Sequence, residues 1–206
     1  MNLNEFFDIL LQNVVNTHWL EIVAVIFGLL SVWYAKKANI LVYPTGIISV
    51  VIYMYICFFA KLYADMGINF VYFVMSIYGW FIWTQKKPGQ ESRPITTCSM
   101  RCHIINILMF VFFFFTLSYV LKNYTDSNVP IWDSLTTAIF IVGMYLMALK
   151  KVENWIAWII ADAISIPLYF HKNLVFTSLQ FAIFLVLAVL GYMEWMRIYQ
   201  KDKKLA

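Results

Sequence analysis

Charged side chains are scarce in this chain. They make up 13% of its 206 residues, whereas soluble domains carry about 25%. Hydrophobic residues reach 63%, and they gather in separate blocks of about 17–23 residues, the length that crosses a bilayer. The net charge of +4 does not indicate a nucleic-acid partner, because the basic residues lie in short loops between these blocks. The composition excludes an ordinary soluble domain and predicts a protein embedded in the lipid bilayer.

The sequence also lacks the motifs of common enzymes and metal sites. It contains no P-loop, no Gly-x-Ser-x-Gly or His-Glu-x-x-His motif and no paired intramembrane acids. Of its three cysteines, Cys57 lies inside a hydrophobic block, and Cys98 and Cys102 have only His103 nearby as a further metal-binding side chain. We therefore expect neither an enzyme nor a bound metal or other cofactor.

The hydrophobic blocks predict an all-α membrane protein with seven transmembrane helices. The predicted spans are residues 19–35, 40–60, 64–83, 103–121, 132–149, 154–170 and 174–196. Residues 1–18 place their apolar side chains on one helical face, which predicts a short amphipathic helix on the membrane surface. The longest polar stretch, residues 84–102, contains Pro, Gly and Ser and is predicted to be a loop.

Basic residues are distributed unevenly between the two sides of these spans. The loops that follow odd-numbered spans hold twelve of the fifteen: Lys36, Lys37, Lys86, Lys87, Arg93, Arg101, Lys150, Lys151, Arg197, Lys201, Lys203 and Lys204. The opposite side holds only Lys61, Lys122 and Lys172. Cytoplasmic loops carry the excess of basic residues, so the C-terminus is predicted to be cytoplasmic and the N-terminus external.

Two groups of three spans share sequence features. Residues 24–37 align without a gap with residues 138–151, and each stretch ends in a Lys pair. The third and seventh spans share Gly-x-x-x-Trp near their inner ends, and their order predicts two parallel three-helix repeats in a three-plus-one-plus-three arrangement. The predicted divisions are a surface helix at 1–18, a first repeat at 19–83, a cytoplasmic loop and linking helix at 84–131, a second repeat at 132–198 and a cytoplasmic tail at 199–206.

An acidic residue near the middle of the sixth span is the most informative polar residue. Asp162 at this depth costs roughly 2.5–3.5 kcal/mol on insertion scales, so such residues usually face a cavity, a partner or a ligand. Trp155 and Trp158 lie on the same helical face. A cation suits both the acid and the faces of the indole rings. The three residues therefore predict a binding site for a small aromatic cation.

Other polar residues in the spans extend this candidate site, and several have alternative interpretations. We predict that the site also includes Ser49, Asn69, Tyr72, Ser76 and Gln180. Asn69, Ser76 and Gln180 also fit a role as hydrogen-bonding residues between helices. Trp155 also fits an interfacial tryptophan, and Trp158, one turn deeper, fits this less well. Asp162 also fits a buried structural acid.

The same residues resemble a known family. The run Val152-Glu-Asn-Trp-Ile-Ala-Trp-Ile-Ile-Ala-Asp-Ala-Ile-Ser165, together with Tyr78-Gly-Trp-Phe-Ile-Trp83 and Leu62-Tyr-Ala-Asp65, resembles the PnuC family of bacterial vitamin transporters over residues 19–198. The resemblance implies a homotrimer in the bacterial plasma (inner) membrane, with Trp155 and Trp158 as ring-binding residues. It implies facilitated diffusion of nicotinamide riboside, which a cytoplasmic vitamin kinase then phosphorylates and traps.

Two positions depart from the riboside-binding pattern of this family. Asp162 stands where those members have Asn, and Asn69 stands where they have Gln. Because the family also includes thiamine transporters, thiamine remains an alternative substrate, and both vitamins are aromatic cations. A seven-helix receptor or channel is the alternative from another class of protein. Among the predicted cytoplasmic loops, only the loop at 84–102 is longer than a few residues, which disfavours a receptor that couples to a partner through such loops.

Overall fold

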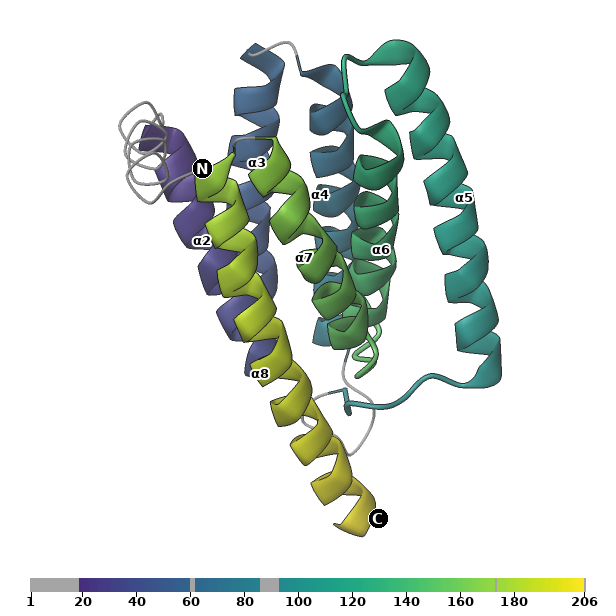
Figure 1. The fold of residues 1–206 in the computed structure, drawn as a ribbon. Coiled ribbons are helices and arrows are strands. Elements are labelled where there is room, and N and C mark those ends of the chain that lie inside the picture. The colour runs from purple at the N-terminus through teal and green to yellow at the C-terminus, as the bar shows by residue number, and fades with distance from the viewer. Residues whose placement is uncertain (1–18, 60–61, 86–92, 173, 206) are drawn as a thin grey trace.

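The computed structural model describes residues 19–59, 62–85, 93–172 and 174–205, and the elements in these residues form a bundle of helices (Figure 1). The helices are α2 (Trp19–Lys36), α3 (Val42–Phe59), α4 (Tyr63–Thr84), α5 (Met100–Tyr124), α6 (Pro130–Ala148), α7 (Asn154–His171) and α8 (Val175–Leu205). The predicted surface helix at 1–18 lies outside the described residues.

The bounds of these helices agree with the predicted spans, and the all-helical membrane fold is confirmed. Six of the described helices are long and apolar enough to cross a membrane. The exception is α7, whose 18 residues correspond to about 27 Å of helix. Its polar residues Asn154, Asp162 and Ser165 lower its mean hydropathy, yet all three are buried within the protein.

The most enclosed helix is α6, which packs against α4, α5 and α7. Of its spanning residues 61% are buried, compared with 11% for α5, which lies at one side of the bundle (Figure 1). Helix α5 exposes large apolar side chains along its length, including Phe112 and Phe115. Helix α8 is regular to Leu205 and extends beyond the bundle, so the residues predicted to be a tail are mostly helical (Figure 1).

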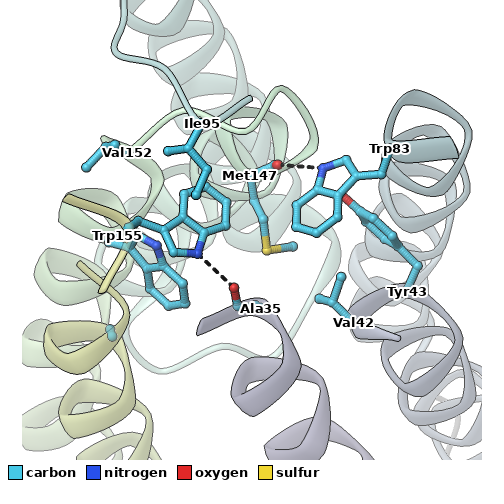
Figure 2. Packing of buried hydrophobic residues seen from close by; sticks show 10 residues of the cluster. Ala35, Val42, Tyr43, Trp83, Ile95, Met147, Val152 and Trp155 are labelled. Carbon is cyan, nitrogen blue, oxygen red and sulfur yellow. Dashed lines mark hydrogen bonds between the residues drawn. The ribbon is translucent and has the colours of Figure 1, made fainter. Parts of the chain in front are cut away.

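Two indole N–H groups, one of them shared between two carbonyls, tie the repeats together near the ends that carry the lysine pairs. Trp83 on α4 donates from Nε1 to the carbonyls of Met147 (3.2 Å) and Ala148 (3.1 Å) at the end of α6. Trp195 on α8 donates from Nε1 to the carbonyl of Ala35 (2.9 Å) at the end of α2. The third helix of each repeat is thus bonded to the first helix of the other (Figure 2).

The bond from Trp83 to Met147 and the bond from Trp195 to Ala35 are related by a shift of 112 residues. Two close contacts of a glycine with an aromatic ring are related by the same shift. A Cβ on Gly79 would lie 2.4 Å from the Tyr43 ring, and a Cβ on Gly191 would lie 2.5 Å from the Trp155 ring. Only glycine leaves room for these rings, because real Cβ contacts are not this short. The structural repeat therefore pairs Tyr43 with Trp155 and Gly79 with Gly191.

The shift of 112 residues corrects the sequence alignment of the lysine pairs, which placed Lys36 opposite Lys150, 114 residues away. Ala38 and Lys150 occupy the matching turns, since each has a positive φ, 50° and 53° respectively. The alignment was wrong by two residues because the lysines mark where the membrane ends, not an equivalent place in the turn.

We expect Trp83→Phe and Trp195→Phe to lower stability to a similar extent. Each substitution keeps an aromatic ring but removes one buried N–H donor, which costs about 1 kcal/mol or about 2–4 °C in melting temperature for a protein of this size. Thermal unfolding of the purified protein in detergent measures the effect. Trp80→Phe is the control, because Trp80 lies on the same helix and is 38% exposed. An equal loss in this control would contradict the role of the two bonds.

Candidate functional site

A small cavity lies between α2, α7 and α8, beside the middle of α7. It is lined by Val32, Ala35, Trp155, Trp158, Asp162, Phe184 and Ala188. Three predicted site residues, Trp155, Trp158 and Asp162, therefore meet at one place. The cavity has room for about one water molecule, so binding of a larger molecule requires the lining side chains or the helices that carry them to move.

Asp162 and Ser165 bring unpaired polar atoms to this region of α7. Both residues are fully buried. Among the described residues, no hydrogen-bond partner is found for either carboxylate oxygen of Asp162 or for the hydroxyl of Ser165. An unpaired buried polar group costs about 1–3 kcal/mol, and a charged one costs more. Buried polar atoms that the protein leaves unpaired in this way are those that a polar ligand can satisfy.

The two tryptophans add ring faces and further N–H donors. The Nε1 atoms of Trp155 and Trp158 are buried without a partner in the described part of the chain. Trp155 is 2% exposed and packs edge-on against Trp195 at 5.6 Å, so it is not an interfacial residue that faces lipid. The ring of Trp158 is partly buried and lies 5.4 Å from the ring of Phe140 on α6.

Gly143 on α6 positions Trp158. A Cβ at this residue would lie 3.0 Å from Nε1 and 3.2 Å from Cδ1 of Trp158, which is tighter than most real contacts. Gly191 makes the corresponding space for Trp155. Sequence reasoning noted Gly191 as part of a repeated motif but missed Gly143, and it also missed the apolar lining residues. A glycine in an apolar helix gives no sign of which side chain packs over it.

The other five predicted residues do not line this cavity. Ser49 donates to the carbonyl of Ala24 on α2 (2.8 Å), and Asn69 donates to the carbonyl of Asp65 on its own helix (2.9 Å). The remaining three lie elsewhere between the helices: Ser76 is buried and faces Gly46 on α3, Tyr72 lies near Tyr169, and Gln180 interacts with Tyr53. Their participation in ligand binding remains a prediction.

The repeat is not symmetric at the cavity. The shift of 112 residues places Gly46 opposite Trp158 and Val50 opposite Asp162. The first repeat thus has neither the indole nor the acid at the corresponding positions of α3. The two repeats share a framework, but only the second provides this combination of rings and carboxylate.

An aromatic cluster lies near the ends of α2 and α6, and Figure 2 shows Tyr43, Trp83 and Trp155 of this cluster. Tyr43 lies 5.1 Å from Trp83, Trp83 lies 6.1 Å from Trp195, and Trp195 in turn contacts Trp155. Lys150, outside the spans, places its ammonium 4.3 Å above the Trp83 ring. Burial, and to a lesser extent the nearby charge of Arg93, lowers the pKa of Lys150 to about 8.

A short segment before α5 holds the start of α7 in place. The backbone N–H of Thr96 donates to the carbonyl of Lys150, and the N–H of Val152 donates to the carbonyl of Thr96, both at 3.0 Å. Glu153 accepts from the N–H of Cys98 at 2.8 Å. The polar loop thus fixes the end of the helix that carries the two site tryptophans.

Known proteins resemble this chain over nearly its whole length. A family model described as Nicotinamide mononucleotide transporter matches residues 18–197. The nicotinamide riboside transporter PnuC of Escherichia coli K12 is 28% identical over 202 residues, covering 86% of this chain and 84% of the relative. The riboflavin/roseoflavin transporter RibM of Streptomyces davaonensis is 23% identical over 194 residues, covering 90% and 88%.

A solved structure agrees with the arrangement of the helices. The crystal structure of the vitamin B3 transporter PnuC matches with a TM-score of 0.71 at 25% identity, and the match covers 95% of this chain and 88% of that chain. The structural match and the family match therefore indicate the same family. The chain therefore belongs to the nicotinamide mononucleotide transporter family, the PnuC family, and is a multi-pass membrane transporter of a small vitamin.

Proposed function

We propose that the protein facilitates uptake of a cationic heteroaromatic vitamin, nicotinamide riboside or a close functional analogue. The observation that carries the proposal is the buried carboxylate of Asp162, which has no partner among the described residues and lies beside two indoles. The ring of the vitamin would lie against Trp155 and Trp158, and its positive charge would face Asp162. Thiamine is the alternative substrate, because it is also an aromatic cation.

The carboxylate favours a cation over a neutral ring system. Relatives include proteins named for nicotinamide riboside and one named for riboflavin and roseoflavin, so family membership alone leaves the substrate open. A buried negative charge is costly, and a fixed positive charge on the ligand offsets that cost better than a neutral group does. This is why we propose a cationic rather than a neutral vitamin as the substrate.

We also propose an oligomeric state, a membrane and an orientation for the transporter. The protein would be a homotrimer in the bacterial inner membrane, with its N-terminus outside and its lysine-rich end in the cytoplasm. Transport would be facilitated diffusion, and a cytoplasmic kinase would trap the vitamin by phosphorylation. A receptor or channel is the competing class, and uptake into empty liposomes without a partner or energy source distinguishes a facilitator from a receptor.

We expect purified protein to bind nicotinamide riboside or thiamine with a Kd below about 1 mM, and Trp158→Ala to abolish that binding. Loss of the ring removes a desolvated cation–π contact that contributes about 2 kcal/mol, and it also leaves a hole in the cavity wall. Isothermal titration in detergent measures both proteins. Failure of the wild type to bind either nicotinamide riboside or thiamine would contradict the proposal, whether or not riboflavin binds, as would unchanged binding by the variant.

Asp162→Asn should weaken binding of a cation by about tenfold or more, while binding of a neutral analogue changes by less than about twofold. The amide keeps the size of the side chain and removes only its charge. Titrations with nicotinamide riboside and with a neutral reduced analogue of the same shape provide the comparison. An equal loss for both ligands would show that Asp162 is a structural acid.

Gly143→Ala should weaken binding by several-fold without unfolding the protein, because the added methyl group displaces the Trp158 indole. Gly67→Ala is the matched control: it is also a helical glycine, but a Cβ there meets nothing within 4 Å. Binding and melting temperature are measured for both. If the two substitutions affected binding alike, Gly143 would have no particular role in placing the indole.

A further inference from the structure

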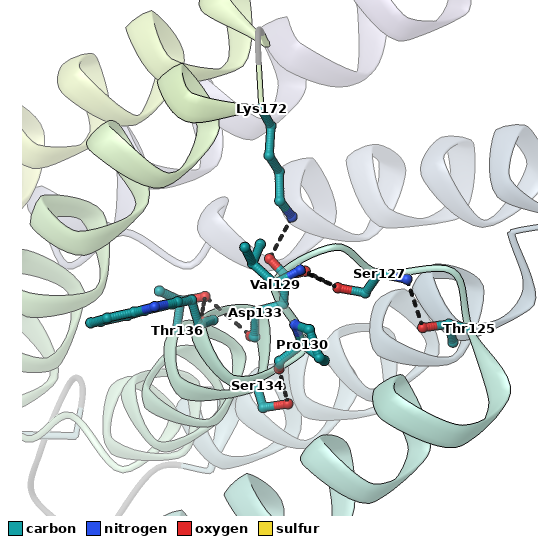
Figure 3. Close-up of polar contacts among 9 residues, drawn as sticks. Thr125, Ser127, Val129, Pro130, Asp133, Ser134, Thr136 and Lys172 are labelled. Carbon is teal, nitrogen blue, oxygen red and sulfur yellow. Dashed lines mark hydrogen bonds and ion pairs between the residues drawn. The ribbon is translucent and has the colours of Figure 1, made fainter.

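At the end of the bundle opposite the lysine pairs, an ion pair joins α7 to α6 (Figure 3). Lys172, just after α7, places Nζ 2.6 Å from Oδ1 of Asp133 in the first turn of α6. The second oxygen of Asp133 accepts from the hydroxyl of Ser127 at 2.7 Å. The side chains of Lys172 and Asp133 are 22% and 19% exposed, so the pair is half-enclosed and accessible from outside the bundle.

The ammonium of Lys172 also lies near the end of a column of aromatic rings. Its Nζ is 5.4 Å from the centroid of the Tyr169 ring. Tyr169 stacks on Phe181 at 5.0 Å, and Phe181 stacks on Phe140 at 5.9 Å. Phe140 in turn lies 5.4 Å from Trp158, which lines the cavity. Contacting rings thus connect this end of the bundle with the candidate site.

The surroundings of Lys172 repeat the chemistry of the cavity. In both places a carboxylate stands beside an aromatic face, Asp133 with Tyr169 here and Asp162 with Trp158 there. Asp65 on α4 lies close enough to Asp133 and Lys172 to interact with both electrostatically. We call Asp65, Asp133 and Lys172 together the rim. Its two carboxylates and one ammonium carry a net negative charge, which attracts a second cation.

We propose that Tyr169 and Asp133 form an outer binding station for an aromatic cation, and that the Lys172 ammonium is a resident cation which the substrate displaces. This inference rests on the proposed function and on its orientation, which places the rim outside the cell. The arriving cation takes the position of Lys172 over Tyr169 and against Asp133. It then passes along the ring column toward Trp158 and Asp162, exchanging one aromatic face for the next.

A purely structural ion pair is the alternative, and it predicts a different pattern of effects. If the pair only braced α6 against α7, removing either partner would break the same contact and would change transport in the same direction. If Lys172 competes with the substrate for Asp133, removing Lys172 strengthens capture of the cation and removing Asp133 weakens it. The directions in which the two substitutions change transport therefore distinguish competition by Lys172 from a purely structural ion pair.

The experiment measures initial uptake of radiolabelled nicotinamide riboside, and separately thiamine, into liposomes that contain the full-length protein. We expect Lys172→Gln to lower the apparent KM by about two- to fivefold and Asp133→Asn to raise it by a similar factor. Lys172→Arg keeps the charge and should behave like the wild type. Because the rim is partly exposed, both shifts should shrink when the ionic strength rises from about 0.05 M to about 0.5 M.

Every outcome of the uptake experiment either supports or overturns the outer station. Shifts of KM in the same direction, or no shift in either variant, would overturn the outer station while wild-type uptake still supported the proposed function. Absence of uptake of both cations by the wild type would overturn the proposed function and this inference together. Melting temperatures of the variants identify any that do not fold. If Asp133→Asn does not fold, Asp133→Glu replaces it, and its KM must rise because the longer side chain moves the carboxylate relative to Tyr169.

Discussion

The rest of this structure depends on the crossed hydrogen bonds of two tryptophans. Helices in a bilayer gain little from hydrophobic burial against one another, so close packing and specific hydrogen bonds determine their arrangement. Trp83 and Trp195 each join the third helix of one repeat to the first helix of the other. The same aromatic cluster forms one end of the cavity, because Trp155 packs against Trp195. The site and the joint between the repeats are therefore mechanically connected.

The candidate site arises from differences between two similar halves. Equivalent glycines, Gly79 and Gly191, admit a ring from the neighbouring helix in each repeat. One and two turns deeper the halves differ, since Trp158 and Asp162 in the second repeat correspond to Gly46 and Val50 in the first. The common framework fixes the positions of the helices, and a few side chains on one half supply rings and charge. Specificity can thus change without disturbing the contacts that hold the bundle together.

Hydropathy predicted much of the fold, because a bilayer requires long apolar helices and places basic residues at their ends. The face formed by Trp155, Trp158 and Asp162 was also predictable, since helical spacing alone brings these side chains together. The register of the repeat was not, because it depends on turn conformation at Ala38 and Lys150. Ser49 and Asn69 bond to backbone carbonyls, and such partners leave no mark in a sequence.

The small size of the cavity has a consequence for the energised membrane in which such a carrier works. A space for about one water molecule cannot hold the continuous chain of waters along which protons move. Among the described residues, this cavity by itself therefore offers protons no continuous path across the membrane.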